Sequence, residues 1–196
     1  MRHLTQIRWR LACGLVAAAI CAAPTLAEDT PLSKRIKDCA PCHGPDGNSR
    51  TATIPSLAGQ PKFFILDQLI FIREGVRPVE AMAPFVKTLK EDEIVALAEH
   101  YAALPPKSSD ENVDPALVVR GAALALRLRC ASCHLPSLVG QEQIPRLAKQ
   151  RIDYMNEVMK AYRDGRRKGG DSIMAATVFG ISDADILALA HYAASR

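Results

Sequence analysis

The sequence has little surplus charge. Its 25 Lys and Arg residues stand against 21 Asp and Glu residues, a formal net charge of +4 at pH 7. Three of the arginines, Arg2, Arg8 and Arg10, lie among residues 1–27, which contain no acidic residue, so residues 28–196 carry 22 basic and 21 acidic residues and a net charge of +1. A nucleic-acid-binding domain would be strongly basic. The charge balance therefore argues against a nucleic acid as a partner.

The sequence also lacks convincing strand patterns. No run alternates apolar and polar residues in the manner of a β-strand, whereas apolar residues recur at helical spacing. Helices are predicted near 32–39, 61–74 and 91–104, and again near 115–130, 151–163 and 183–195, with Ser182 capping the last. The predicted fold class is all-α.

Cysteine is scarce outside two motifs. Of six cysteines, Cys13 and Cys21 fall among residues 1–27, where a basic start, an apolar run from Leu11 to Ala23 and Thr25-Leu26-Ala27 predict a cleaved signal peptide. The apolar run is too short for a comfortable membrane span. Export to the periplasm is expected, a compartment that permits disulfides. The four remaining cysteines all belong to the motifs, so none is left for a structural disulfide.

The two motifs are Cys39-Ala40-Pro41-Cys42-His43 and Cys130-Ala131-Ser132-Cys133-His134. Their spacing is that of c-type haem attachment, in which each thiol forms a thioether to a haem vinyl group and the histidine becomes the proximal iron ligand. Zinc would need further Cys or His at finger-like spacings, and a redox dithiol would need a βαβ context. A disulfide is the third alternative. Two complete motifs favour two haem c groups.

An internal repeat divides the chain. Residues 54–60, Ile-Pro-Ser-Leu-Ala-Gly-Gln, match 144–150, Ile-Pro-Arg-Leu-Ala-Lys-Gln, and 73–77 match 163–167, both at an offset of 90. Such self-similarity indicates a tandem duplication. The expected organisation is a signal peptide at 1–27, a first domain at 28–104, a Pro- and Ser-containing linker at 105–114 and a second domain at 115–196.

The ligand on the far side of each haem iron, opposite the histidine, largely sets the function of that haem. Met82 follows His43 by 39 residues and Met174 follows His134 by 40, so both are predicted axial ligands. Met155 and Met159, one helical turn apart, have no counterpart in the first copy and are interpreted as core residues. The other histidines of residues 28–196, His100 and His191, are interpreted as helix-face residues, with iron ligation as the alternative.

Two further roles are expected around the haems. A backbone carbonyl in the Ile-Pro-X-Leu segments that contain Pro55 and Pro145 could accept a hydrogen bond from the proximal histidine, with a simple turn as the alternative. Guanidinium groups match carboxylates well, so four arginines are candidates for the haem propionates, although most surface arginines are simply solvated: Arg73, Arg77, Arg163 and Arg167.

The chain resembles bacterial dihaem cytochromes of the cytochrome c4 family. The resemblance is carried by residues 39–49, Cys-Ala-Pro-Cys-His-Gly-Pro-Asp-Gly-Asn-Ser, by the segment ending at Gln60, by the Arg-Glu-Gly turn at 73–75 and by the methionine before the last helix. It implies two class I cytochrome c folds with His and Met ligation, a periplasmic location and, in some members, a peripheral position at the membrane surface. The second copy departs from the pattern at residues 135–140, Leu-Pro-Ser-Leu-Val-Gly.

Three functions compete. The first is a periplasmic carrier that passes electrons between redox proteins such as a quinol-oxidising complex or a dehydrogenase and a terminal oxidase, as the resemblance implies. The second is a fixed electron-accepting subunit of a dehydrogenase complex. The third, a haem peroxidase, needs an exchangeable iron position and distal acid–base groups. Two Met ligands argue against the third, so the chain is expected not to be an enzyme.

The signal-peptide hypothesis predicts cleavage after Ala27. Periplasmic protein should give an intact mass for a chain that begins at Glu28 and carries two haems. Trp9 is the only tryptophan, so the mature protein should also lack tryptophan. A peptide that contains Trp9 in a digest of the purified mature protein would contradict the cleavage site.

Overall fold

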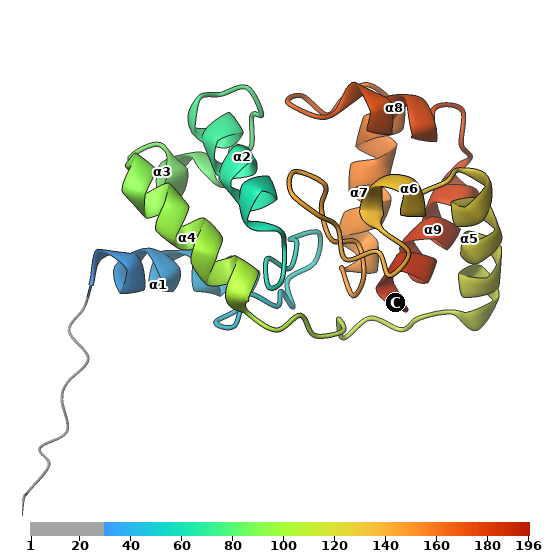
Figure 1. Ribbon diagram of the computed structural model, residues 1–196, viewed down its shortest axis with the longest axis horizontal. Helices are drawn as coiled ribbons and strands as arrows, with labels where there is room; N and C mark the ends of the chain where they lie inside the picture. Colours follow the sequence, from blue (N-terminus) through green and yellow to red (C-terminus); the bar gives the residue numbers. More distant parts are fainter. Residues whose placement is uncertain (1–29) are drawn as a thin grey trace, which may run out of the picture.

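The computed structural model describes residues 30–196 as two helical halves placed side by side (Figure 1). The predicted signal peptide at 1–27 lies outside the described residues. In the first half the helices are α1 Pro31–His43, α2 Lys62–Arg73, α3 Ala83–Val86 and α4 Glu91–Ala103. In the second they are α5 Pro115–Arg127, α6 Ala131–His134, α7 Ile152–Arg163, α8 Ser172–Val178 and α9 Asp183–Ala194. Apart from one isolated bridge between Gln141 and Ile144, residues 30–196 contain no β-structure, and the all-α prediction is confirmed.

Side-chain caps fix where several helices begin. The Asp114 carboxylate accepts from the backbone N–H groups of Ala116 and Leu117, and Pro115 occupies the first position of α5. Pro is tolerated there because that N–H has no partner within the helix. At α9, the Ser182 hydroxyl accepts from the Asp185 N–H at 3.1 Å, as predicted. These local signals explain why the starts of α5 and α9 could be placed from the sequence.

The two haem-attachment motifs lie in different backbone contexts. α1 runs through the whole first motif to His43, past the predicted end at residue 39, although it contains Pro41. In the second half, α5 ends at Arg127, and Arg129, in the left-handed region at φ 55°, precedes the short helix α6 that carries Cys133 and His134. The predicted helix end near residue 130 is therefore about one turn too late.

Each half has its own hydrophobic core. In the first, Ile65 and Ile72 of α2 pack with Ile94 and Leu97 of α4. In the second, α9 is the central helix: it packs on α5 and α7 and buries Ile186, among other residues. Within residues 30–196 no single helix is long and apolar enough to cross a bilayer. Taken together, α8 and α9 have the length and the apolar composition of a span, but the chain bends by 117° between them.

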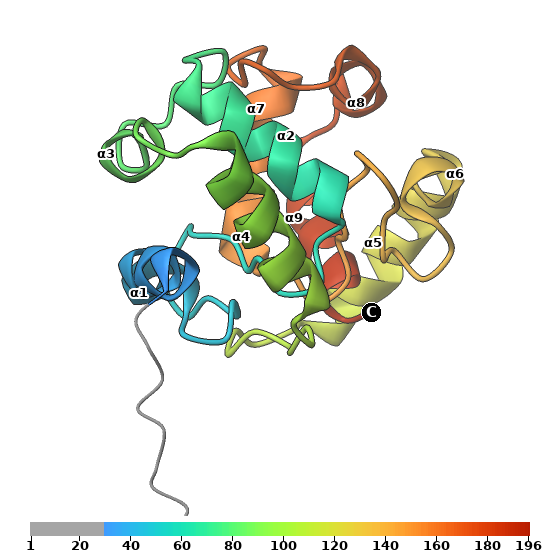
Figure 2. The same cartoon turned by 60° about the vertical axis from the view of Figure 1, so that its left-hand side comes forward.

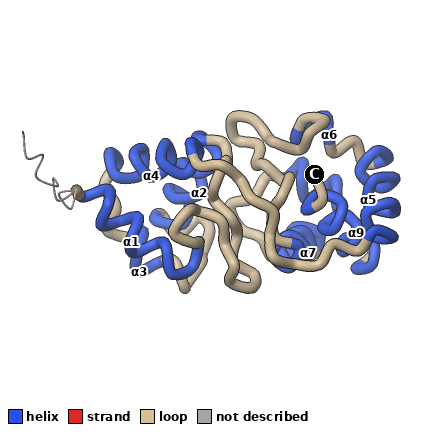
Figure 3. The backbone as a smooth tube through the Cα atoms, turned by 90° about the horizontal axis from the view of Figure 1, so that it is seen from below, coloured by secondary structure: helices blue, strands red, loops and turns tan. Residues whose placement is uncertain are grey.

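The halves meet mainly through loops (Figure 3), although α2 also contacts the second half through Phe64 and Gln68. The buried Gln60 side chain donates to the Arg146 carbonyl at 2.9 Å and accepts from the Arg146 N–H at 3.0 Å. The buried Gln150 side chain does the same with Ser56, at 2.9 and 2.8 Å. Each glutamine and each backbone partner is related to its counterpart by the repeat offset of 90. The contact therefore has the reciprocal form of a two-fold interface between like subunits, built here within one chain.

A prediction for stability comes from the α5–α9 crossing. A Cβ atom added at Gly121 would lie 2.1 Å from the Ala188 carbonyl oxygen and 2.7 Å from the Tyr192 Cβ. Gly121→Ala should therefore lower the free energy of unfolding by about 1–3 kcal/mol, despite the ~1 kcal/mol that alanine gains in helix propensity. Urea unfolding followed by circular dichroism measures the change. Ala123→Ser, on the exposed face of α5, should change it by less than about 0.5 kcal/mol; equal effects of the two substitutions would refute the packing argument.

Candidate haem-binding site

One cavity of about 790 Å³ runs between the two halves and is lined mainly by apolar side chains. The structure brings every predicted attachment and ligand residue to its wall: Cys39, Cys42, His43 and Met82 from the first half, and Cys130, Cys133, His134 and Met174 from the second. Residues that are more than 130 positions apart in the chain thus share one lining.

His43 is the last residue of α1 and only 6% of its surface is exposed. Its Nδ1 lies 2.9 Å from the Pro55 carbonyl oxygen. Because a carbonyl can only accept, Nδ1 carries the proton and donates it, and Nε2 keeps its lone pair. Burial lowers the pKa of His43, while the bond to Pro55 opposes that shift. The side chain is thus an oriented, neutral imidazole, the form in which histidine binds iron.

His134 has the same arrangement in the second half. It is 8% exposed, and its Nδ1 donates to the Pro145 carbonyl oxygen at 2.8 Å. Burial again lowers the pKa of the imidazole, with the hydrogen bond to Pro145 opposing. The carbonyl acceptor proposed from the Ile-Pro segments is therefore present in both halves, and the simple-turn alternative is not sufficient.

The motif cysteines lie beside their histidines on the wall of the cavity. All four cysteines of residues 30–196 are unbridged; Cys39 and Cys130 are half-buried, and Cys42 and Cys133 are exposed. Burial raises the pKa of both half-buried thiols. On α1, residues three positions apart lie on the same helix face, so Cys39 and Cys42 present their sulfur atoms to the same side. This placement suits attachment of one group at two points.

Residues 135–140 of the second half, which depart from the family pattern in sequence, resemble the matching loop of the first half in backbone conformation. Gly44 and Gly47 have φ values of 84° and 72°, and their counterparts Leu135 and Leu138 have φ values of 68° and 57°. The Leu57 N–H donates to the Gly47 carbonyl at 2.7 Å, and the Leu147 N–H to the Leu138 carbonyl at 2.8 Å. A left-handed conformation costs a non-glycine residue about 1–2 kcal/mol. Leu138 offsets that cost by burial, since it is only 2% exposed.

The four methionines of residues 30–196 fall into two groups, as their positions in the repeat suggest. Met82 directly precedes α3 and Met174 lies on α8, and each is half-buried against the core of its own half. Met155 and Met159 also reach the cavity, but they are 3% and 8% exposed members of the second core on α7. Their counterparts at the repeat offset of 90 are the apolar Ile65 and Leu69 of α2, which supports the packing role.

The two remaining histidines are not among the residues that line the cavity. His191 Nδ1 accepts from the backbone N–H of Asp114 at 3.0 Å and so ties α9 to the start of α5. The ring of His100 packs edge-on against Tyr101, with 5.1 Å between centroids. Both contacts support the helix-face interpretation.

The four candidate arginines separate into two pairs. Arg73 contacts Glu74 at 2.7 Å and Glu91 at 3.2 Å, and Arg163 contacts Asp164 at 2.7 Å and also Asp183, so this pair makes surface ion pairs. Arg77 and Arg167 instead line the cavity, and within residues 30–196 no carboxylate lies within ion-pair distance of either.

Arg146 is a cavity residue that the sequence did not reveal. It is 2% exposed, and its guanidinium donates to the carbonyls of Ala148 and, at 2.8 Å across the interface, Ala58. Its Nε is buried without a hydrogen-bond partner, and burial lowers its pKa to about 10. The repeat gave no signal because Ser56 stands at the matching position. A cavity with apolar walls and guanidinium groups lacking carboxylate partners fits an apolar group that carries carboxylates, as haem does.

An all-helical chain with two Cys-X-X-Cys-His sites on one apolar cavity defines a dihaem c-type cytochrome. Residues 33–100 match the family described as cytochrome c oxidase, cbb3-type, subunit III, and residues 118–195 match the family described as cytochrome c. The chain is 33% identical over 165 residues to cytochrome c4 of Pseudomonas aeruginosa, covering 79% of this chain and 81% of that protein. The chain belongs to the cytochrome c4 family.

Two further comparisons agree. A thiosulfate dehydrogenase electron acceptor of Thiomonas intermedia is 31% identical over 207 residues, which cover 100% of this chain and 94% of that protein. The crystal structure of reduced recombinant cytochrome c4 from Pseudomonas stutzeri superposes with a TM-score of 0.76 at 28% identity, over 83% of this chain and 95% of that one. The chain is therefore an electron-transfer protein and not itself an enzyme, as the sequence predicted.

Proposed function

We propose that the chain holds two haem c groups and passes electrons between redox proteins of the periplasm. One haem is attached through Cys39 and Cys42 in a first domain, 28–104, and the other through Cys130 and Cys133 in a second domain, 115–196. The axial ligand pairs are His43 with Met82 and His134 with Met174. The observation that carries the proposal is the matched pair of oriented, neutral histidines on a cavity that also receives one repeat-matched methionine from each half.

When bound, haem c supplies a reversible one-electron change at its iron. The hydrogen bond from Nδ1 to a proline carbonyl holds each imidazole in place and raises its basicity as a ligand. A methionine thioether is a soft, neutral ligand that raises the reduction potential. The mainly apolar lining limits the access of water to both sites. Together these residues favour electron transfer over substrate binding at the iron, which a peroxidase would require.

The periplasmic location follows from the predicted signal peptide at residues 1–27. In the carrier role, the chain takes electrons from a quinol-oxidising complex or a dehydrogenase and delivers them towards a terminal oxidase. Residues 28–110 carry a net charge of −2 and residues 111–196 a net charge of +3, an asymmetry that would orient docking with charged partners.

A second candidate role is that of the electron-accepting partner of a dehydrogenase. It is favoured by the relative from Thiomonas intermedia, which is named for that role and matches this chain over its whole length. Affinity purification from the periplasm at low ionic strength separates the two roles. A dehydrogenase that co-purifies in a fixed ratio supports the subunit role, whereas isolation of the chain alone supports the freely diffusing carrier.

Each mature chain should carry two covalently attached haems. A pyridine haemochrome assay after acid–acetone extraction should give two haems per mature chain, because each motif has its own pair of thiols. Replacing both cysteines of one motif, Cys39 and Cys42 or Cys130 and Cys133, with alanine should halve that value. Extractable haem, or a single haem in the unsubstituted protein, would contradict the attachment sites.

Met82→Ala and Met174→Ala test the axial ligands. Each should remove about half of the weak near-infrared band that marks Met-to-ferric-iron ligation, lower one of the two midpoint potentials and open one iron to carbon monoxide. Met155→Ala and Met159→Ala are matched controls on the same cavity and should keep the band intact. A Met82 or Met174 variant that retains the full band and both potentials would reject the ligand assignment at that haem.

A further inference from the structure

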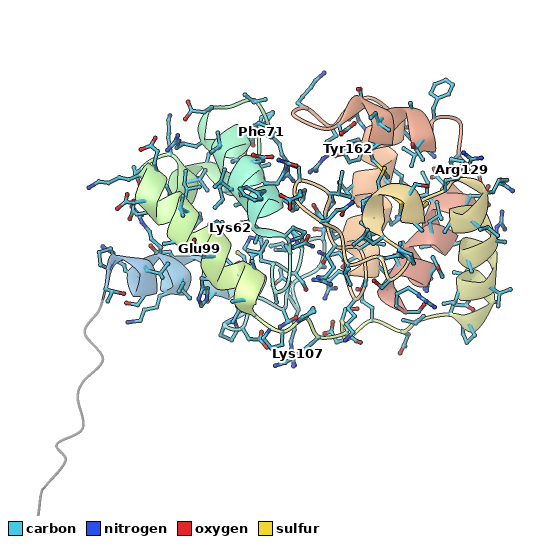
Figure 4. The ribbon with its side chains drawn as sticks, in the orientation of Figure 1. Lys62, Phe71, Glu99, Lys107, Arg129 and Tyr162 are labelled. Carbon is cyan, nitrogen blue, oxygen red and sulfur yellow. The ribbon has the colours of Figure 1, made fainter. Side chains whose placement is uncertain are left out.

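The cavity wall of the first half contains a buried hydroxyl group. Tyr101 on α4 is 3% exposed and lines the cavity, and within residues 30–196 its hydroxyl has no hydrogen-bond partner. Glu99, labelled in Figure 4, pairs with Lys62 at the surface, at 2.6 Å. Tyr101 lies two residues later, turned about 200° around the helix from Glu99, and therefore points inward. A buried donor without a partner is costly, so an acceptor from outside the polypeptide is expected here.

The thiol of Cys39 lies beside this hydroxyl. α1, which carries Cys39, packs against α4 (Figures 1 and 2), and Cys39 contacts the core that contains Tyr101. Burial, and then the adjacent Cys39, raise the pKa of Tyr101. Burial also raises the pKa of Cys39, and Tyr101 opposes that rise. The two groups are thus close enough to interact, although the thiol does not satisfy the hydroxyl.

The second half has an alanine at the equivalent place. The Gly59 N–H donates to the Tyr101 carbonyl at 2.9 Å, and the N–H of its counterpart Lys149 donates to the Ala193 carbonyl at 3.2 Å. Ala193 therefore occupies in the second half the position of Tyr101 in the first. It is buried and also lines the cavity. The duplicated sites thus differ by one tyrosine side chain.

A second exchange compensates for the difference in volume. A Cβ atom at Gly47 would lie 3.0 Å from Tyr101 Cδ1, so the glycine leaves room for the ring. Its counterpart in the second half is Leu138, which is buried on the cavity wall. Gly47 is thus paired with Tyr101 in one half, and Leu138 with Ala193 in the other. The space is filled in both halves, but only the first has a hydroxyl in it.

Haem attachment changes what the Cys39 sulfur can do. When the S–H group adds across a haem vinyl group, an S–C bond forms and the thiol hydrogen passes to the other vinyl carbon, without an oxidant or a reductant. The sulfur of the resulting thioether has lone pairs but no hydrogen, like that of methionine, so it can only accept a hydrogen bond. The Tyr101 hydroxyl beside it has an O–H to donate.

We propose that the Tyr101 hydroxyl donates a hydrogen bond to the thioether sulfur of Cys39 and thereby raises the reduction potential of the first haem. The proposal rests on the proposed attachment of haem at Cys39 and Cys42. The positive end of the O–H dipole points towards a haem that gains an electron on reduction, and such a dipole acts strongly in a buried place. The side chains of Leu138 and Ala193 have no donor, so the effect is confined to the first haem.

The test is a potentiometric titration of the holoprotein with Tyr101→Phe, which removes only the hydroxyl. One midpoint potential, the one that Met82→Ala also lowers, should fall by about threefold in the reduction equilibrium, or ~28 mV for a one-electron couple. The other midpoint should not change. Tyr192→Phe is the matched control: it makes the same substitution on α9, next to Ala193, where the ring lies 5.6 Å below the Arg196 guanidinium. It should leave both midpoints unchanged.

Infrared difference spectra between the oxidised and reduced protein separate the hydrogen bond from packing. The unsubstituted protein and Tyr192→Phe should show a tyrosine C–O band that changes on reduction, and Tyr101→Phe should lack it. The hydrogen bond is wrong if Tyr101→Phe leaves both midpoints unchanged, if it shifts the midpoint that Met174→Ala lowers, or if the unsubstituted protein lacks the tyrosine band. In those outcomes, two covalent haems and an intact near-infrared band would show that the proposed function still holds. Loss of haem or of the near-infrared band from the unsubstituted protein would instead reject that function.

Discussion

The hydrogen bond from each motif histidine to a proline carbonyl connects the sites to the rest of the architecture. The proline belongs to the repeated segment Ile-Pro-X-Leu-Ala-X-Gln, at 54–60 and 144–150. In each copy the proline carbonyl accepts a hydrogen bond from the motif histidine. The residue after the proline is hydrogen-bonded through its backbone to the glutamine of the other copy, and the glutamine that ends the segment makes the equivalent bond in the opposite direction. One heptapeptide thus orients an iron ligand and joins the two halves. Each imidazole is therefore held in a fixed relation to the interface.

The two roles of this heptapeptide, orienting the histidine and joining the halves, also explain why two small domains form one cavity. Domains of about 80 residues bury too little apolar surface to be robust alone, and each half has a separate, modest core. The halves meet mainly through loops, and residues of both halves line the cavity between them. Cavity walls supplied by both halves enclose the sites better than either half could alone.

Much of the local structure could be predicted from the sequence, because local signals determine it. The long helices follow from apolar spacing and from caps such as Ser182. The short helices α3, α6 and α8 were not predicted, since four to seven residues are too few for a helical period to show. The arginines show the limit more clearly: Arg73 and Arg77 lie in the same turn, yet one points to surface carboxylates and the other lines the cavity. Arg73 has a partner beside it in the sequence, Glu74, whereas the place of Arg77 on the cavity wall is a tertiary feature that no neighbouring residue indicates. The partner of Gln60 is 86 residues away, and no local pattern could have indicated it.

The two-fold relation between the halves is broken where a buried charge replaces a small side chain. Ser56 and Arg146 occupy equivalent positions, and both use their backbones in the reciprocal glutamine pairing. Only Arg146 also sends a guanidinium through the interface to the Ala58 carbonyl of the other half. Burying such a cation is costly unless it is compensated, and its unpartnered Nε shows that the protein compensates it only in part. The duplicated sites therefore share their ligand-orienting geometry but not their electrostatic surroundings, because the backbone frame accommodates both Ser56 and Arg146 at the residue after the proline.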